Sequence, residues 1–503
     1  MISDVCLVLE GTYPYVSGGV SAWVYDIIKK NPSTTFYILF IGAKKPIKKK
    51  LHFELPNNVV GFKEVYLYEY PEEKLSLHKL KHLTKGLSKK DFKSLKEILY
   101  SIRKNDISLF SSLLNIMRSK DAPTVQDLAY SYEAWKLIEK LYMEDDREIS
   151  FIDYFWTWRL IYLPFINLIK TEIPLCKMYH AISTGYAGLI GSMAKTIHNR
   201  PFILTEHGIY TRERKIEIAR SKWIYSELSD EIKIKDEAEE FFKDWWISLF
   251  SYFSTLTYAH ADEIISLYEE NREIQIEEGA EASKTKVIPN AIDFSFYDNI
   301  TERKYPQKKY KVAMVARVVP IKDIKTFIRA SKAVLEALDN VEIEIIGPMD
   351  EEPEYVEECY KLRRILNLED KLIFTGKLNL KEYYPLIDLL VLTSISEAQP
   401  LVILEAYRYG IPVVSSNVGS CKSLLEGHSP EDRLLGKSGI ITDICNAEET
   451  ADAIIKIISN PTLHNNMSKI AIERVDRYYG YEYLIAQYRK IYDSYMEEQK
   501  WQV

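Results

Sequence analysis

Residues 393–410, Thr-Ser-Ile-Ser-Glu-Ala-Gln-Pro-Leu-Val-Ile-Leu-Glu-Ala-Tyr-Arg-Tyr-Gly, decide the fold of this chain. The apolar run at 388–393 predicts a buried strand leading into a short polar loop. A helix is predicted to open at Pro400 and to close at Gly410. Proline suits the first helical position because its missing N–H would have no intrahelical partner there, and glycine suits the position just past the end.

The start of this helix is predicted to bind a phosphate. The N–H groups of Leu401 and Val402 have no intrahelical partner, and the helix dipole favours an anion beside them. Two carboxylates flank this position, Glu397 on the loop and Glu405 about one turn into the helix. Because Pro400 makes a continuous helix between them unfavourable, we expect the two carboxylates to hold different parts of one ligand. The two hydroxyls of a ribose would suit Glu405.

The spacing of these glutamates resembles the Glu-x7-Glu motif of family 4 retaining glycosyltransferases, which have the GT-B fold. The longer string SISEAQPLVILEAYRYGIPVVSSNVGSC, residues 394–421, is similar to the PelF-like group of this family, the cytosolic glycosyltransferases of Pel exopolysaccharide synthesis. A bare Glu-x7-Glu pattern is more often a helix with two solvated glutamates. The preceding strand, the Pro-Leu helix start and the Gly-Ile-Pro-Val-Val restart favour the glycosyltransferase interpretation.

Length and composition exclude several classes of protein. A chain of 503 residues is too long for one core, and its 47% apolar content can fill two. The formal charge of −7 argues against general nucleic-acid binding, so an anionic substrate needs a local basic cluster. The five cysteines fit a reducing cytosol because they show no disulfide framework or metal spacing. The apolar stretches 151–168 and 245–257 are expected to be buried helices, and the N-terminus reads as a strand instead of a signal peptide.

The predicted domains follow the alternation of strands and helices. Residues 1–300 are expected to form a Rossmann-like acceptor domain with a helical insertion at about 72–170. Residues 301–470 are expected to form a second Rossmann-like domain, which the resemblance implies is the one that binds the UDP-sugar. In the GT-B fold the last helix, here within 471–503, crosses back onto the first domain. The lysine-rich run at 44–50 is expected to be a solvated loop, with contact to acidic lipid or a membrane partner as the alternative.

A glycine pair, Gly18 and Gly19, lies between the first predicted strand, 5–9, and the helix that follows from about Ser21. Glycines let a backbone approach a ligand closely, and a helix start offers N–H donors. Alone, the pair would describe an ordinary turn. In family 4 a Gly-Gly loop at this place faces the donor phosphates and the acceptor cleft, so the resemblance implies that both glycines contact the donor.

A histidine follows another strand of the first domain, in the string TEHGIYTRER at 205–214. A lone histidine is more often structural than catalytic, but this string is close to that of the PelF-like group. In family 4 the histidine after this strand reaches the transferred sugar, so the resemblance implies that His207 is a catalytic-centre residue that positions the sugar. Arg212 and Arg214 are weaker candidates for binding the acceptor or a phosphate, and Glu206 is expected to orient its neighbours.

Two cations, Arg317 and Lys322, lie five residues apart on a predicted strand-to-helix loop of the second domain, in the frame ARVVPIKDIKTFI. Arginine offers a planar fork to phosphate oxygens and lysine a compact charge. Taken alone, the pair would be two solvated cations. In family 4 it grips the diphosphate of the nucleotide sugar, although Ala316 here replaces the usual glycine. Residues 374–376 and Leu378 lie where the family holds the base.

The resemblance implies a fold of class α/β, GT-B, with two Rossmann-like domains facing across a deep cleft. It also implies transfer of a sugar from a UDP-sugar with retention of configuration. Arg317, Lys322 and the helix start at Pro400, Leu401 and Val402 would stabilise the departing UDP by fixed electrostatics. Glu397 would hold sugar hydroxyls. Because the sequence has no Asp-x-Asp pair, we expect no metal and no other cofactor.

The expected donor is UDP-glucose or a UDP-N-acetylhexosamine, and the expected acceptor is a growing Pel-type polysaccharide of a biofilm matrix. The resemblance places the protein in the cytoplasm, with inner-membrane Pel proteins as the partners that would bring it to the membrane periphery; nucleic acid is not expected as a partner. Two alternatives stay open. One is an epimerase or glycogen-type synthase of the same shape, which product analysis would separate. The other is a non-catalytic UDP-sugar-binding scaffold subunit of a membrane polysaccharide complex, which acceptor-dependent UDP release would separate.

Overall fold

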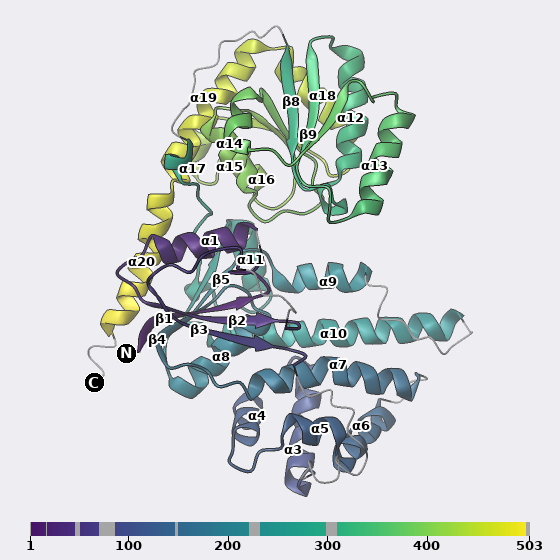
Figure 1. The fold of residues 1–503 in the computed structure, drawn as a ribbon, viewed down its shortest axis with the longest axis vertical. Coiled ribbons are helices and arrows are strands. Elements are labelled where there is room, and N and C mark those ends of the chain that lie inside the picture. Colours follow the sequence, from purple (N-terminus) through teal and green to yellow (C-terminus); the bar gives the residue numbers. More distant parts are fainter. Residues whose placement is uncertain are drawn as a thin grey trace. The chain divides into compact units, whose positions relative to one another are not determined.

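The computed structural model describes residues 2–16, 18–45, 51–69, 86–145, 149–220, 232–297 and 309–498. It divides into two compact units (Figure 1). Unit 1 comprises Met1–Ser266, Arg272–Lys286 and Arg489–Val503. Unit 2 comprises Leu267–Asn271 and Val287–Tyr488. Part of the predicted insertion, part of the lysine-rich run and the predicted boundary at 300 lie outside the described residues.

Unit 1 is built on a seven-stranded sheet in the order β3-β2-β1-β4-β5-β6-β7, in which the pairings from β3 to β6 are parallel. The central strands are continuous apolar runs because helices cover both faces of a parallel sheet. The strands are β1 (Ser3–Glu10), β2 (Phe36–Gly42), β3 (Val59–Tyr66), β4 (Cys176–Ala181), β5 (Phe202–Glu206), β6 (Glu263–Ser266) and β7 (Thr285–Val287).

A group of helices stands between β3 and β4, in the region predicted as a helical insertion. Its helices are α3 (Lys89–Arg103), α4 (Phe110–Met117), α5 (Val125–Tyr130), α6 (Tyr132–Glu144) and α7 (Phe151–Ile169). Ser88, Thr124, Ser131 and Ser150 cap the starts of four of them by accepting a backbone N–H. The apolar side chains of this group join the core of the sheet.

The remaining helices of unit 1 follow its strands. They are α1 (Gly19–Lys29), α8 (Tyr186–His198), α9 (Tyr210–Arg220), α10 (Ile232–His260) and α11 (Glu269–Glu277), of which the part up to Asn271 belongs to unit 2. Figure 1 shows α7 and α10 running alongside one another, and they contact each other in the core. None of the helices in the described part of the chain is both long enough and apolar enough to cross a membrane.

Unit 2 is built on a six-stranded sheet in the order β10-β9-β8-β11-β12-β13, with parallel pairing throughout. Its strands are β8 (Tyr310–Val315), β9 (Val341–Ile346), β10 (Leu372–Gly376), β11 (Leu389–Leu392), β12 (Val413–Ser416) and β13 (Gly439–Thr442). Its helices are α12 (Ile324–Ala337), α13 (Pro353–Ile365), α14 (Leu380–Tyr383), α15 (Leu401–Arg408), α16 (Cys421–Glu426), α17 (Pro430–Arg433), α18 (Ala447–Ile458) and α19 (Pro461–Tyr478).

Each sheet has one point where the strand order reverses. In unit 1 this point lies between β1 and β4, and in unit 2 it lies between β8 and β11. Loops that leave the carboxyl ends of two such strands run in opposite directions, so a crevice opens between them, where open α/β sheets bind ligands. The loops after β8 and β11 carry Lys322 and Glu397.

The last helix, α20 (Tyr481–Glu498), contributes residues to both units. Its C-terminal part packs on unit 1, where the hydroxyl of Tyr492 lies 2.8 Å from Nδ1 of the buried His180 on β4. The guanidinium of Arg489 donates to the carbonyl oxygen of Lys30 at 3.0 Å. The expected class, α/β with two Rossmann-like parallel sheets, is confirmed.

Candidate active site

The predicted site residues Lys322 and Glu397 form an ion pair in unit 2. Nζ of Lys322 lies 2.5 Å from Oε1 of Glu397, and the two side chains are only 19% and 10% exposed. The sequence assigned these residues to different parts of a ligand, the phosphate and the sugar, but the structure brings their charges together. A lysine ammonium carries three N–H donors, so the pair leaves Lys322 with donors for a phosphate oxygen.

Hydrogen bonds between the two loops fix this pair in place. The N–H of Ile395 donates to the carbonyl of Ile321 at 2.9 Å, and Oγ1 of Thr393 donates to the carbonyl of Asp323 at 2.9 Å. Oγ of Ser394 donates to the same Oε1 of Glu397 that Lys322 contacts, at 2.7 Å. The carboxylate is therefore held before any ligand binds, which reduces the entropy that binding would otherwise cost.

A third loop, which follows β12, packs against the loop that carries Glu397. The N–H of Ser420 donates to the carbonyl of Ala398 at 2.8 Å. Gly419 adopts a φ of +50°, and a Cβ there would lie 2.2 Å from the carbonyl oxygen of Glu397. Glycine is needed at 419 both for its left-handed backbone and for this close approach.

Helix α15 begins at Leu401, one residue later than predicted. Pro400 is the N-cap, with an extended ψ of 112°, and its carbonyl accepts the N–H of Ile403 at 3.1 Å. The prediction that proline is the first helical residue is therefore wrong, because the chain is still extended where it leaves the loop. Gly410 has a φ of +65° just past the end of the helix, as expected. No acceptor in the described part of the chain takes the N–H of Leu401 or Val402.

Glu405 lies half-buried inside α15. Its Oε2 accepts the hydroxyl of Tyr384 at 2.6 Å, and the Tyr384 ring stacks on Tyr409 with centroids 5.7 Å apart. These contacts orient the carboxylate, and its other lone pairs can accept hydrogen bonds from ligand hydroxyls.

Arg317, the other predicted phosphate ligand, has a different partner. Its guanidinium is half-exposed and pairs with Glu351 at 2.5 Å. Exposed ion pairs are weak, so this arginine is available to an incoming anion. Ala316, in place of the family glycine, does not have a positive φ, and its N–H joins the sheet by donating to Ile346 at 2.9 Å. The predicted base-binding Phe374 packs edge-on against Tyr360, with centroids 4.8 Å apart.

In unit 1, His207 follows β5 as predicted. Its ring packs edge-on against Trp23, with centroids 4.9 Å apart. Burial lowers the pKa of His207 to about 4, so the imidazole is neutral at neutral pH. Its Nε2 has no hydrogen-bond partner among the described residues. A neutral ring can donate one hydrogen bond and accept another, which suits contact with a sugar hydroxyl.

Glu206, next to His207, is buried and accepts four hydrogen bonds. The N–H of Tyr210 and the hydroxyl of Thr184 reach Oε1 at 3.0 and 3.2 Å. The hydroxyl of Tyr258 and the amide of Gln275 reach Oε2 at 2.8 and 3.0 Å. Burial raises the pKa of Glu206 to about 7 although these hydrogen bonds oppose the rise. These contacts link Glu206 to four neighbouring groups, and its orienting role stays a prediction.

Gly18 is the N-cap of α1, which begins at Gly19. The φ of Gly18 is 168°, an extended value that any residue can adopt, and a Cβ there would meet no atom of the described residues within 4 Å. The fold of the described part of the chain therefore does not itself require glycine at 18. The space beside it is open to a ligand.

The two arginines of α9 are paired within unit 1. Arg212 is half-exposed and lies 3.9 Å from Glu277. Arg214 pairs with Glu217 at 2.7 Å, and its guanidinium lies 5.0 Å from the centre of the Tyr210 ring. Arg214 is thus held against the protein, whereas Arg212 retains the freedom to contact an acceptor.

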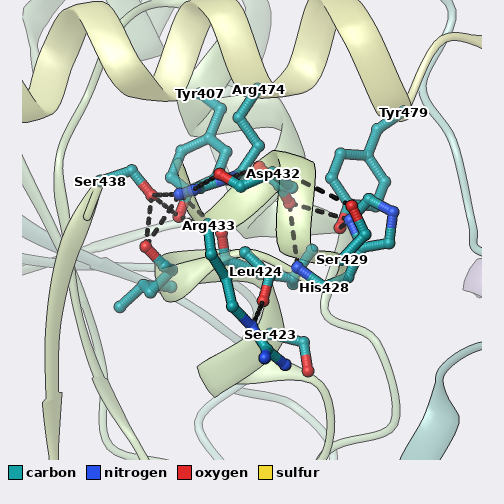
Figure 2. Close-up of polar contacts among 12 residues, drawn as sticks. Tyr407, Ser423, Leu424, His428, Ser429, Asp432, Arg433, Ser438, Arg474 and Tyr479 are labelled. Atoms are coloured by element: carbon teal, nitrogen blue, oxygen red, sulfur yellow. Dashed lines mark hydrogen bonds and ion pairs between the residues drawn. The ribbon is translucent and has the colours of Figure 1, made fainter. Parts of the chain in front are cut away.

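Sequence reasoning missed the buried network behind α15. Asp432 and Arg474 are fully buried and paired at 2.6 Å. Figure 2 shows Asp432 between Arg474 and His428. Oγ of Ser438 accepts from Arg474 at 2.9 Å and lies 2.6 Å from the hydroxyl of Tyr407 on α15. The only sequence signal was an arginine on the apolar face of α19, which a helical-wheel comparison could have found.

Comparison with known proteins identifies both units. A family model described as "Domain of unknown function (DUF3492)" matches residues 3–283, more than half of the chain. The chain belongs to the DUF3492 family. A second model, described as "Glycosyl transferases group 1", matches residues 298–474. Unit 2, which carries Lys322 and Glu397, thus contains a group 1 glycosyltransferase domain.

Curated relatives of this DUF3492 protein are glycosyltransferases and a glycosyl-malate synthase. The N-acetyl-alpha-D-glucosaminyl L-malate synthase of Bacillus anthracis is 26% identical over 42% of this chain and 57% of its own length. The D-inositol 3-phosphate glycosyltransferase of Kribbella flavida is 23% identical over 63% of this chain and 76% of its own. The chain thus spans little more than half of the B. anthracis protein.

Solved structures show the fold. Anabaena Alr3699/HepE in complex with UDP and glucose superimposes with a TM-score of 0.56 at 15% identity, covering 98% of this chain and 100% of that one. Sucrose-phosphate synthase from Thermosynechococcus elongatus gives 0.57 at 16% identity, covering 98% and 99%. Both structures cover nearly the whole chain, and the expected GT-B fold is confirmed.

Proposed function

We propose that the protein is a retaining, metal-independent glycosyltransferase of family 4 that transfers a sugar from a UDP-sugar to a growing exopolysaccharide of the Pel type. The observation that carries this proposal is the ion pair of Lys322 and Glu397 on the loops after β8 and β11. Glu397 lies on the loop that leads into α15. The first N–H groups of α15 have no acceptor in the described part of the chain. A cation, a carboxylate and a helix start are the groups that a sugar diphosphate needs.

The reaction breaks the bond between the anomeric carbon and the phosphate oxygen and forms a bond from that carbon to an acceptor hydroxyl. With retention, attack occurs on the face that the phosphate leaves, and the acceptor proton passes to a leaving phosphate oxygen. The charge that develops on UDP is stabilised by Lys322, by Arg317 and by the N–H groups of Leu401 and Val402. Such preorganised groups commonly contribute about 10²–10³-fold in rate each.

The other predicted residues hold the rest of the substrate. Glu397, fixed by Lys322 and Ser394, accepts sugar hydroxyls, and Glu405 accepts those of the ribose. His207 contacts the transferred sugar through its neutral ring, and Gly18 with Gly19 gives close access to the phosphates. Because fixed cations and a helix dipole already oppose the charge of the leaving group, we propose that no metal ion or other cofactor is required.

Relatives support the choice of a UDP-sugar. Anabaena Alr3699/HepE was crystallised with UDP-glucose, and its structure superimposes with a TM-score of 0.55 over 97% of this chain. A relative from Escherichia coli, 24% identical over 46% of this chain, is a UDP-Gal:alpha-D-GlcNAc-diphosphoundecaprenol alpha-1,3-galactosyltransferase. The string at 394–421 favours the PelF-like group. We therefore propose a Pel-type acceptor, and a cytoplasmic protein that Pel complex proteins bring to the inner membrane.

The test uses the full chain, titrated calorimetrically with UDP, UDP-glucose and UDP-N-acetylhexosamines. A UDP-sugar that binds is then incubated with oligosaccharide acceptors, with and without EDTA. We expect UDP release that depends on the acceptor and is unchanged by EDTA, a product heavier by one sugar, and the donor's anomeric configuration by NMR. Binding without turnover would support the scaffold alternative, and inversion or loss of activity with EDTA would overturn the corresponding part of the proposal.

A further inference from the structure

Unit 2 contains a cavity of about 500 Å³ that is separate from the predicted donor residues. Neither Lys322, Glu397 nor Glu405 lines it. Four tyrosines contribute to its wall, and they come from the segment after β6 and from the junction of α19 with α20. These are Tyr268, Tyr478, Tyr479 and Tyr483. A cavity of this size with an aromatic wall and a few polar groups is typical of a small-molecule site.

One polar group of the wall is a histidine of fixed orientation. Nδ1 of His428 lies 2.8 Å from Oδ2 of Asp432, which is fully buried and paired with Arg474 (Figure 2). Hydrogen bonds from His428 and Arg474 outweigh the effect of burial and keep the pKa of Asp432 below its ordinary value. Since the ionised carboxylate can only accept, Nδ1 carries the proton of this hydrogen bond, and the contact fixes the ring with Nε2 on its other side.

Two further polar side chains of the wall have unused hydrogen-bonding capacity. Ser420 is 1% exposed, and its Oγ has no hydrogen-bond partner in the described part of the chain. An unsatisfied buried hydroxyl is unfavourable, so a ligand that hydrogen-bonds Ser420 would relieve this cost. Oε1 of Gln399 accepts the N–H of Asn290 at 2.6 Å, which directs one end of this amide and leaves its NH₂ group for another partner.

The charges of the wall restrict the class of ligand. Among the residues that line the cavity, Glu269 and Arg477 are the fully charged ones, and Arg477 is itself paired with Glu473 on α19. A phosphate site would need a cluster of cations, and a lipid-chain site would lack the serines, the glutamine and the histidine. The lining instead combines aromatic rings with neutral donors and acceptors. A pyranose has matching chemistry, because its C–H face packs on a ring while its hydroxyls need hydrogen bonds.

We propose that this cavity binds a neutral pyranose unit of a saccharide chain. The inference deepens the proposed function and rests on it, since it makes the bound unit a part of the acceptor or product polymer. Gln399 and Ser420 both line the cavity. Gln399 lies in the loop between Glu397 and Pro400, and the N–H of Ser420 donates to the carbonyl of Ala398 in the same loop. A saccharide unit in the cavity therefore contacts the backbone segment that positions the donor-site carboxylate.

The test measures binding of glucose oligomers and N-acetylglucosamine oligomers of two to four units to the full chain by calorimetry and saturation-transfer NMR. Ser420→Ala removes the unsatisfied hydroxyl, and Tyr483→Ala removes a ring that is 55% exposed and so adds little to stability. We expect each change to weaken oligosaccharide binding about tenfold, the effect of one lost hydrogen bond or ring contact. Matched controls are Ser331→Ala, a buried serine of α12, and Tyr132→Ala, an exposed tyrosine of unit 1.

The arms of the test separate the two proposals. Saturating UDP should leave oligosaccharide binding in place, because the cavity is distinct from the donor site. Competition by UDP, or unchanged binding in both cavity variants, would place the oligosaccharide elsewhere and overturn the inference. If UDP-sugars bind and turn over but no oligosaccharide binds this cavity, the inference fails alone. If neither UDP-sugar nor oligosaccharide binds, the proposed function fails with it.

Discussion

Lys322 and Glu397, 75 residues apart in the chain, form an ion pair whose two charged atoms are 2.5 Å apart. They meet because β8 and β11 are neighbours at the reversal of the strand order. The pair neutralises each member without filling the hydrogen-bonding capacity of either. A carboxylate held this way keeps its geometry while a ligand enters.

Lys322→Ala should lower sugar transfer strongly. The change removes the cation that opposes charge on the leaving phosphate and leaves Glu397 without its ionic partner, so we expect a loss of about 10²–10³-fold in kcat. The measurement is the initial rate of UDP release with saturating donor. Lys325→Ala is a matched control, since this lysine of α12 pairs with Glu358 outside the site. Equal rates for the two variants would contradict the assignment of Lys322.

Gly419→Ala should impair activity through the backbone of Glu397. An added Cβ would lie 2.2 Å from that carbonyl oxygen, so the loop must shift by more than a side-chain rotation could absorb. Gly279→Ala is the control, because Gly279 also has a positive φ, +107°, but nothing within 4 Å of its Cβ position. We expect Gly279→Ala to lose about 1 kcal/mol or more of stability through strain alone, whereas Gly419→Ala additionally loses transfer activity. Similar activity in both variants would show that the contact is dispensable.

Asp432→Ala should destabilise unit 2. Asp432 and Arg474 are both fully buried, and the change leaves an uncompensated guanidinium in the core. Breaking such a pair typically costs about 3–5 kcal/mol. Urea unfolding followed by circular dichroism measures the change. Lys437→Ala breaks an exposed pair with Glu426 and should lower the free energy of unfolding by less than about 1 kcal/mol. A similar loss in both variants would contradict the importance of the buried pair.

Glu206 should give the protein a stability that falls as pH rises through the weakly acidic range. Burial raises its folded pKa to about 7 from an ordinary value of 4.5, so the folded state binds its proton more tightly than the unfolded state. The contribution is complete below pH 4.5, decreases as pH rises, and is lost by about pH 7. Glu206→Gln should flatten this part of the profile of unfolding free energy against pH.

The comparison with Glu206→Gln is needed because a buried histidine acts in the opposite direction. Burial lowers the pKa of His180 to about 3, so its contribution is lost as pH falls below 6.5. The two effects overlap in the total profile but not in the difference between wild type and variant. A difference that does not change with pH between 4.5 and 7 would show that Glu206 has the same pKa in the folded and unfolded states.

The fold was predictable from local patterns, since apolar runs and turn residues act over a few positions. The strand predicted at 388–393 is β11 (Leu389–Leu392), and the strand predicted at 5–9 lies within β1 (Ser3–Glu10). The helix after Pro400 differs from its prediction by one residue at the start. These features depend on the buried faces of a parallel sheet, which the sequence shows directly.

Contacts between loops were not predictable from the same patterns. The pairing of Lys322 with Glu397 depends on which strands are neighbours, and the unsatisfied hydroxyl of Ser420 depends on how its loop packs. A helical wheel places Arg474 on the apolar face of α19, but its pairing with Asp432 depends on packing that the sequence does not show. The roles of His207, Arg317, Glu405 and the glycine pair stay predictions, because they concern a ligand.

Helix α20 makes the two units inseparable as gene fragments. Residues up to Tyr488 group with unit 2, whereas Arg489 and those beyond it group with unit 1, where Tyr492 meets His180. A fragment that ends before α20 would leave the buried imidazole of His180 without the hydroxyl of Tyr492. A fragment that contains unit 2 and all of α20 would expose the part of the helix that packs in unit 1. Dissection of this protein therefore requires fragments in which α20 is divided after Tyr488, so that each unit keeps its own part of the helix.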